Sequence, residues 1–302
     1  MGYKDLGERQ ILGRLFLALS ETAPPAWVSD IGMYVTSDQE VETHRALQAT
    51  PALREWLGGR QAKRIAVDEQ IIVNKRYEAT LEVSRSELRR EKLGQIDIRI
   101  AELAQRAATH WTKLLTEQIE ANANTYDGAA FFSAHADGTN LVAPAAATPA
   151  EPTAAEAEKA VFDVLETFYG MNDSEGEPLN QDLSQLTIMV PVNMFGAFQR
   201  AMNDGVITDG SGTRTNSVVN LGGMDMRIAV NPRLTTGATF YAFRSDSAAK
   251  PYILQEELTP KVEVLGEGSD FAFNNDAHQY GVSKSCAVAN GVWQYATKCT
   301  FA

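Results

Sequence analysis

The segment from Pro51 to Asn140 constrains the fold most, because its hydrophobic period changes along it. In Tyr77–Ser84 apolar side chains alternate with polar ones, which predicts a half-buried strand. The β-rich run Arg64–Val73 precedes that strand, and Asn74–Arg76 between them is predicted to be a turn. Residues 95–122 place apolar side chains every three or four positions, which predicts one helix of ~42 Å at ~1.5 Å per residue. We therefore expect an extended β-hairpin followed by a long amphipathic helix.

The loop after this helix carries the residues that most resemble a catalytic group. It holds Asp127, Ser133, His135 and Asp137, types that can serve as nucleophile, base and orienting acid. Ser133 and His135 stand two residues apart, so on an extended chain they are expected to point to opposite faces. We expect a structural turn instead, in which His135 bonds to a backbone group. Hydrolysis by Ser133, His135 and Asp137 is kept as an alternative.

Charge and motif content exclude several classes of function. A net charge of −12 opposes tight binding to nucleic-acid phosphates. The four histidines lie in different segments without ligand spacing, so neither a metal nor a cofactor is expected. Cys286 and Cys299 are expected to be buried free thiols, with a cross-strand disulfide as the alternative. We find neither a membrane-spanning stretch nor a secretory signal.

The regions flanking the segment suggest a mixed α+β chain. Residues 1–50 form an arm whose apolar side chains either fold back on the chain's own core or cover a neighbour. Ala143–Pro152 is a linker, and Thr153 is the predicted cap of a new helix. Gly205–Gly223 is predicted to be a long flexible loop. Strands are predicted in much of the rest of the chain: Leu186–Val190, Met226–Val230, Thr239–Phe243, Tyr252–Leu254, Val262–Leu265, His278–Val288 and Gly291–Phe301.

A set of short motifs, taken in order and spacing, resembles the Mu-like phage major head subunit. That family has the tailed-phage major capsid fold, which encapsulins also use. The resemblance covers most of the chain. The motifs are Leu53–Trp56, Gly59-Arg60, Asn74-Lys75, Tyr77-Glu78, Val83–Arg85, Leu93-Gly94, Tyr126–Gly128, Phe131-Phe132, His135 and Gly291–Ala296.

This resemblance implies a domain plan for the chain. The N-terminal arm is residues 1–50, and the extended hairpin is residues 51–90. A peripheral domain with a spine helix at 95–122 takes residues 91–177 and is rejoined by about 250–285. An axial domain takes residues 178–249 and is rejoined by about 286–302. The resemblance also favours contact between the arm and a neighbour, and it implies that the Gly205–Gly223 loop lies at a ring axis.

The implied function is structural and not enzymatic. The chain would self-assemble into the pentamers and hexamers of an icosahedral phage or prophage head that encloses double-stranded DNA without binding it specifically. It would be assembled in the bacterial cytoplasm with separate scaffold, protease and portal proteins, would reside in the virion capsid, and would not contact a membrane. An encapsulin-type compartment shell is the alternative within the same fold.

The predicted hairpin supplies the candidate contacts between subunits. An isolated two-stranded ribbon is marginal in water and needs a surface to lie on. The mixed charge of the hairpin favours a role in setting the register between subunits and in choosing the partner, more than in affinity. Exposed ion pairs contribute only ~0–1 kcal/mol each to the free energy of association. An ordinary solvated hairpin is the competing interpretation. The candidate residues are Arg60, Arg64, Lys75, Arg76, Tyr77, Glu78 and Glu82.

Overall fold

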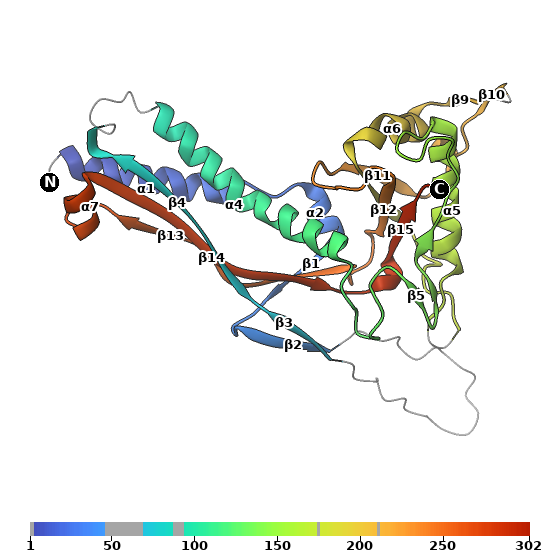
Figure 1. Ribbon diagram of the computed structural model, residues 1–302, viewed down its shortest axis with the longest axis horizontal. Coiled ribbons are helices and arrows are strands. Elements are labelled where there is room, and N and C mark those ends of the chain that lie inside the picture. Colours follow the sequence, from blue (N-terminus) through green and yellow to red (C-terminus); the bar gives the residue numbers. More distant parts are fainter. Residues whose placement is uncertain (1–2, 46–68, 87–93, 174–175, 210–211) are drawn as a thin grey trace, which may run out of the picture.

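The computed structural model describes residues 3–45, 69–86, 94–173, 176–209 and 212–302, and the molecule is elongated (Figure 1). One end of its long axis is built on a four-stranded sheet and the other on a five-stranded sheet. The helix α4 (Gly94–Ala121) runs along the first sheet toward the second. Surfaces at the two ends of this elongated molecule are therefore far apart.

The four-stranded sheet has the strand order β1-β13-β14-β4. The two central strands, β13 (Tyr252–Leu265) and β14 (Ala277–Asn290), are antiparallel and have 14 residues each. At the far tip α7 (Asp270–Asn275) reverses the chain between them. The edge strand β4 (Lys75–Ser84) is antiparallel to β14, and β1 (Gly32–Thr36) is parallel to β13.

One face of this sheet is covered by α4, which confirms the predicted long helix. It has 28 residues, and its buried side chains lie on one stripe that faces the sheet. Burial of an apolar stripe, more than intrinsic propensity, stabilises a helix of this kind. The buried residues are Ile96, Ile100, Leu103, Ala104, Trp111, Leu115 and Ile119.

The N-terminal segment folds back on the chain's own core. The helix α1 (Tyr3–Glu21) packs on α4, and its Ile11 and Leu15 are buried in the cluster that holds Ile96. The short helix α2 (Ala26–Ile31) buries two further apolar side chains beside Trp111. On the outer side of α1, Phe16 is 52% exposed. Contact of that outer side with a neighbour remains a prediction.

The predicted pairing of the β-hairpin is wrong. The strand β3 (Glu69–Val73) pairs with β2 (Val41–Arg45), whereas β4 pairs with β14. Asn74 is not part of a turn, because its backbone N–H donates to the carbonyl of Glu40. This bond extends the β2–β3 pairing beyond Val41 and Val73. The alternation in β4 was interpreted correctly as a half-buried strand, but a period of two does not identify the partner strand.

The five-stranded sheet has the order β11-β8-β12-β15-β7 and is covered on both faces. Two helices, α5 (Ala154–Gly170) and α6 (Phe195–Asn203), pack on one face, while α2 and the C-terminal half of α4 pack on the other. Burial on both sides explains the continuous apolar run of the central strand. The strands are β7 (Leu141–Val142), β8 (Gln185–Val190), β11 (Asp225–Val230), β12 (Thr239–Arg244) and β15 (Ala296–Thr300).

The segment predicted as a peripheral domain, residues 91–177, spans both sheets. Its N-terminal part is α4, but α5 shares a core with β8 of the second sheet. The helix start was predicted correctly, since Thr153 and Glu156 form a reciprocal capping box. What the sequence does not show is which sheet the linker Ala143–Pro152 leads to.

The region Gly205–Gly223, predicted to be a loop, contains short secondary structure in its described part. It contains the antiparallel pair β9 (Val206–Asp209) and β10 (Gly212–Thr215), followed by η2 (Val218–Asn220). This pair lies at the opposite end of the molecule from α7 (Figure 1). The remaining short elements are β5 (Ala134–His135), β6 (Gly138–Thr139), η1 (Val192–Met194) and η3 (Trp293–Tyr295).

Both cysteines are buried free thiols, as predicted, and they lie in different sheets. Burial raises the pKa of Cys286 to about 11, so this thiol stays protonated at neutral pH.

Among the residues that the structure describes, no helix is long and apolar enough to cross a membrane.

Trp111 gives a direct test of the core. It is 6% exposed, the ring of Tyr34 meets it edge-on at 5.8 Å, and the Lys284 ammonium lies 4.4 Å from its centroid. We expect Trp111→Ala to lower the free energy of unfolding by ~3–5 kcal/mol, the cost of a large buried cavity. Urea denaturation measures this change. Tyr169→Ala, at an exposed aromatic on α5, is the control, and equal denaturation midpoints for the two variants would contradict the assignment.

Candidate assembly surfaces

The predicted contact residues divide into three groups. Arg60 and Arg64 lie outside the described residues. Lys75, Arg76, Glu78 and Glu82 are exposed along β4. Within the described part of the chain β4 is a sheet edge, because only β14 pairs with it. Four of the seven residues therefore lie at an edge where another chain can approach.

Tyr77 is partly buried and packs against the core. Its ring meets the ring of His110 at 4.3 Å, with 61° between the planes, so it points toward α4. Burial is the main cause that lowers the pKa of His110 to about 4, and Lys284 lowers it further, so the imidazole is neutral when it packs on Tyr77. Tyr77 packs inward and is only partly exposed, so it offers less surface than its neighbours on β4, and its role in a contact between subunits stays a prediction.

Two of the exposed carboxylates of β4 accept hydrogen bonds from other described residues. Glu78 accepts a hydrogen bond from the Thr80 hydroxyl at 2.9 Å. Glu82 accepts one from the Gln279 amide at 3.4 Å, on the neighbouring strand. Both partners are neutral groups. The role of these carboxylates in contacts between subunits stays a prediction.

The ribbon formed by β2 and β3 exposes a surface that the sequence reasoning missed. Ile72 faces the four-stranded sheet and is buried, whereas the outer face of the ribbon carries Val41, Ile71 and Val73. Ile71 is 65% exposed. The signal was present as three successive apolar residues, Ile71 to Val73, which make both faces of one strand apolar. We call Val41, Ile71 and Val73 the outer ribbon face.

Another exposed aromatic stands at the distal tip of the molecule. Phe273 on α7 is 87% exposed, and Leu265, at the end of β13, is also exposed. The helix α1, which begins at the same end of the molecule (Figure 1), adds the exposed side chains of Phe16 and Leu17. These residues are apolar and lie on surfaces separate from the outer ribbon face.

At the opposite end, the β9–β10 pair is held to α5 by one ionic contact. Arg214 on β10 pairs with Glu158 on α5 and with Asp209 at 3.3 Å. The Glu158 carboxylate is 3% exposed and also accepts the backbone N–H of Ser217 at 3.0 Å. Burial alone would raise the pKa of Glu158, but Arg214 and Ser217 outweigh burial and hold that pKa below its ordinary value. The pair is thus fixed relative to α5.

The expected geometry of Ser133 and His135 is wrong. The chain bends before His135, and the Ser133 hydroxyl lies 3.4 Å from His135 Nε2. His135 Nδ1 lies 2.5 Å from Asp127 Oδ2, so Asp127, and not Asp137, is the carboxylate that pairs with it. The His135 side chain is 1% exposed and stacks on Trp293 at 3.8 Å. The three groups are therefore aligned in a nucleophile, base and acid order.

Bonds within the loop occupy these same groups. The Ser133 hydroxyl donates to the carbonyl of Ala130 at 2.7 Å, and His135 Nε2 lies 3.3 Å from the carbonyl of Phe131. The predicted backbone partner of His135 is therefore present. The neighbouring backbone N–H of Ser133 is bonded to Asn140, so it is not directed at a reacting oxygen. The arrangement closes a turn after α4. The described residues hold no cluster of three or more metal-ligating side chains.

Comparison with protein families gives a match over most of the chain. The family model described as "Mu-like prophage major head subunit gpT" matches residues 10–151 and 218–300. A curated relative, the Mu-like prophage FluMu major head subunit of Haemophilus influenzae, is 30% identical over 124 residues. That alignment covers 38% of this chain and 40% of the relative, so the chain matches less than half of the relative's length.

Solved structures similar to this one are capsid and particle proteins. The procapsid protein of bacteriophage JBD30 is 25% identical, with a TM-score of 0.57, and the match covers 97% of this chain and 73% of that one. A virus-like particle protein from Pyrococcus furiosus has a TM-score of 0.58 at 10% identity, covering 96% and 98%. The capsid of an empty GTA particle has a TM-score of 0.57 at 15% identity, covering 91% and 89%. The last two show likeness of fold alone, and the predicted α+β capsid fold is confirmed.

The Glu158–Arg214 contact predicts an acid-dependent stability. A carboxylate whose folded pKa is depressed contributes stability above its unfolded pKa, and this contribution is lost as the pH falls through the folded value. We expect Glu158→Gln to lower the melting temperature at pH 7. The gap from wild type should then shrink as the pH falls below about 4.5, the ordinary pKa of glutamate. Thermal melts across a pH series measure it. Glu166→Gln, on the exposed side of α5, is the control, and a gap that stays constant down to pH ~3 would contradict the account.

The bonded turn after α4 predicts a structural role for His135. His135→Ala removes the ring stacked on Trp293 and the partner of Asp127, so we expect the free energy of unfolding to fall by ~1–3 kcal/mol. Ser133→Ala should cost less than ~1 kcal/mol, because it removes one neutral hydrogen bond. Urea denaturation measures both changes. Hydrolysis of a p-nitrophenyl ester by the wild type, abolished in both variants, would instead show an active site.

Proposed function

Because the chain belongs to the Mu-like prophage major head subunit family, we propose that it builds the shell of a phage or prophage head through contacts with copies of itself. The family is structural and not enzymatic, and its fold is that of tailed-phage capsid subunits. A capsid subunit of this kind assembles into a multimeric shell and resides in the virion capsid. The geometry of the contacts and the identity of the partners are proposals.

The outer ribbon face is the observation that best supports assembly. A soluble monomer rarely leaves a projecting strand pair with an apolar outer face in water. Val41 and Val73 are paired across the ribbon, and Ile71 stands beside them, so the three side chains form one continuous strip. We infer that a neighbouring subunit covers this strip. Ile71 and Val73 belong to the predicted hairpin segment 51–90, of which residues 51–68 and 87–90 lie outside the described residues, so this face is an additional candidate contact within that segment.

Separate surfaces on an elongated subunit suit a shell, where each copy touches several others. Phe273 at the tip and Phe16 on α1 are candidates for contacts distant from the ring axis. The β9–β10 pair is our candidate for the ring axis of pentamers and hexamers, and it is fixed to α5 by Arg214. On this view the second sheet with α5 and α6 forms the axial domain, and the first sheet with α4 forms the peripheral domain.

Electrostatics in this proposal govern partner choice and DNA packaging. The exposed charges of β4 would set the register between neighbouring subunits, because complementary charges give specificity more than affinity. A net charge of −12 would let the shell enclose double-stranded DNA without binding it specifically.

The family suggests which proteins assist assembly, and the fold suggests a second candidate function. We infer assembly in the bacterial cytoplasm, with scaffold, protease and portal functions on separate proteins. An encapsulin-type compartment remains the second candidate, since the Pyrococcus furiosus virus-like particle protein shares the fold over 96% of this chain. Packaged DNA in purified particles supports the phage head, and a protein cargo in its place supports the compartment.

Ile71→Lys tests the outer ribbon face. Ile71 is 65% exposed in the subunit, so we expect the variant to fold with an unchanged melting temperature. A lysine ammonium in a covered apolar contact carries a desolvation cost of several kcal/mol, so shells should fail to form. Sedimentation and negative-stain microscopy measure shell yield, and Ile71→Val is the matched control, which should assemble normally. Normal shells from Ile71→Lys would show that no neighbour covers this face.

A further inference from the structure

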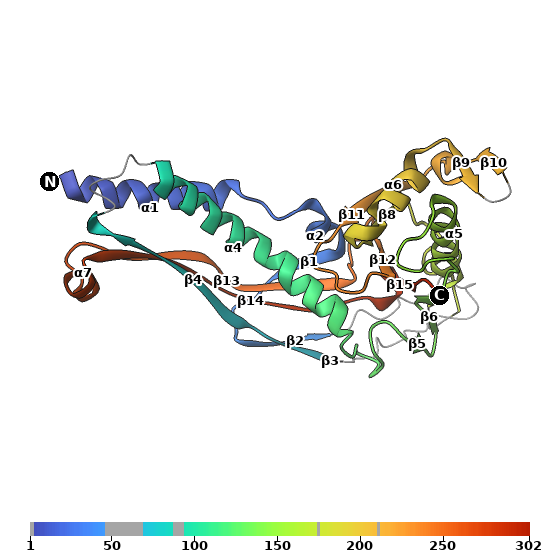
Figure 2. The same ribbon diagram turned by 45° about the horizontal axis from the view of Figure 1, so that its top comes forward.

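The ribbon of β2 and β3 is held on the subunit by a small apolar contact. It lies on the face of the four-stranded sheet opposite α4 (Figure 1, Figure 2). There Ile72 packs on Ile253 and Ala289, and the remaining contributors are partly buried. One inward-facing isoleucine gives little directional preference, because hydrophobic contact is not directional.

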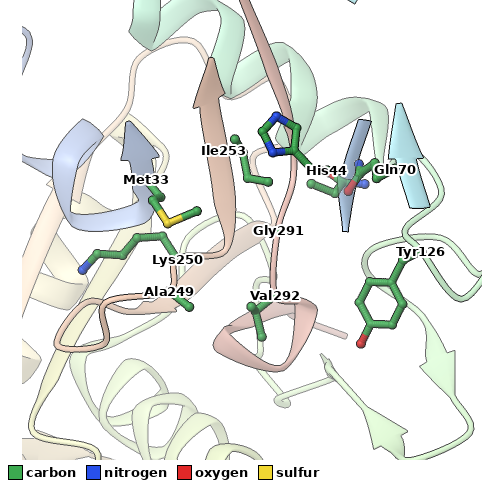
Figure 3. Close-up of a pocket in the computed structure, with 10 residues that line it drawn as sticks. Met33, His44, Gln70, Tyr126, Ala249, Lys250, Ile253, Gly291 and Val292 are labelled. Carbon is green, nitrogen blue, oxygen red and sulfur yellow. The ribbon is translucent and has the colours of Figure 1, made fainter. Parts of the chain in front are cut away.

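Among the described residues, a hollow lies beside this contact. It has a volume of about 210 Å³. His44 and Gln70 of the ribbon line one side, and Met33 and Lys250 line the other (Figure 3). Apolar packing among the described residues therefore covers only part of the inner side of the ribbon.

A chain of hydrogen bonds through Gln255 supplies the missing direction. Gln255 on β13 is fully buried, and its side chain points toward the ribbon. Its amide nitrogen donates to Asn74 Oδ1 at 3.0 Å, and its amide oxygen lies 2.6 Å from His44 Nε2. Gln255 thus bonds β2 at His44 and the junction between β3 and β4 at Asn74.

The proton positions in this chain follow from its far end. Asn74 donates from its side-chain nitrogen to the carbonyl of Gln39 at 2.8 Å, so its Oδ1 is an acceptor. Gln255 must then donate from nitrogen to Asn74, which leaves its oxygen as the acceptor for His44 Nε2–H. Both the neutral Nε2–H tautomer and the imidazolium form of His44 supply this donor. Protonation of His44 therefore does not break the bond.

We propose that Gln255 is a positioning residue for assembly, fixing the angle of the β2–β3 ribbon through His44 and Asn74 so that the outer ribbon face is presented to a neighbour in one orientation. This inference rests on the proposed function. Preorganisation of a binding segment raises affinity by removing its ordering cost at the moment of contact. The ribbon is therefore held by directional polar bonds in addition to the apolar contact at Ile72.

Gln255→Met tests the proposal, because methionine is similar in length but makes neither bond. Nitroxide labels at Thr43→Cys on the ribbon and Lys261→Cys on β13 report the ribbon angle by double electron–electron resonance. Both sites are exposed, and the native Cys286 and Cys299 are buried. We expect one narrow distance distribution for the parent and a broad one for Gln255→Met, with the oriented fraction falling by about tenfold for two lost hydrogen bonds.

Control variants separate positioning from stability. Gln279→Met removes a different amide from the same sheet, one bonded to Glu82, and should leave the distribution narrow. His44→Leu removes only the hydrogen-bond donor on the ribbon and should broaden the distance distribution. This variant tests the proposal even when Gln255→Met does not fold. His44→Gln restores a donor to Gln255, so it should narrow the distance distribution again and, in the unlabelled chain, restore shell yield. A narrow distribution in both Gln255→Met and His44→Leu would overturn the proposal.

Different outcomes contradict shell building by the chain and the positioning role of Gln255. Absence of shells from the wild type would contradict the proposed function, while the label distances would still report whether Gln255 orients the ribbon. Normal shells from wild type with a narrow distribution in the variants would contradict the positioning role alone. Broad distributions together with low shell yield in Gln255→Met, restored by His44→Gln in the His44 series, would support the proposal.

Discussion

The structure depends on one aromatic cluster at the junction of the two sheets. The C-terminal half of α4 inserts Trp111 and Leu115 there, between strands of both sheets. Phe131, from the turn after α4, stacks on Tyr252 of the first sheet at 5.0 Å. Phe132, the next residue, meets Tyr241 of the second sheet at 5.3 Å. Close packing of this kind transmits position from one sheet to the other, so the two ends of the subunit keep a fixed relation.

This junction explains why the turn after α4 looks catalytic without belonging to an enzyme family. His135 and Asn140 close the turn against Trp293 and hold Phe131 and Phe132 at the angle the cluster requires. The alignment of Ser133, His135 and Asp127 is a consequence of that closure. Apolar packing at the junction fixes the centre of the subunit. At the periphery, the polar bonds of Gln255 are proposed to fix the β2–β3 ribbon.

The sequence predicted those features whose cause lies within one segment. The α4 stripe, the Thr153 cap and the buried thiols were each encoded by local spacing or residue type. The pairing of β3 with β2 and the contact of His135 with Ser133 were not, because they depend on where distant or bent chain segments meet. The outer ribbon face was missed for the same reason. Its apolar run was visible at Ile71, but a strand has no inner and outer face until its partner is known.

A cryo-electron microscopy reconstruction of particles formed by the wild-type chain tests the central claim most directly. The account predicts closed shells in which a neighbouring subunit covers Val41, Ile71 and Val73, with the β9–β10 pair at the ring axes. Particles in which the outer ribbon face lies in solvent would contradict it. So would a chain that stays monomeric in the presence of its assembly partners.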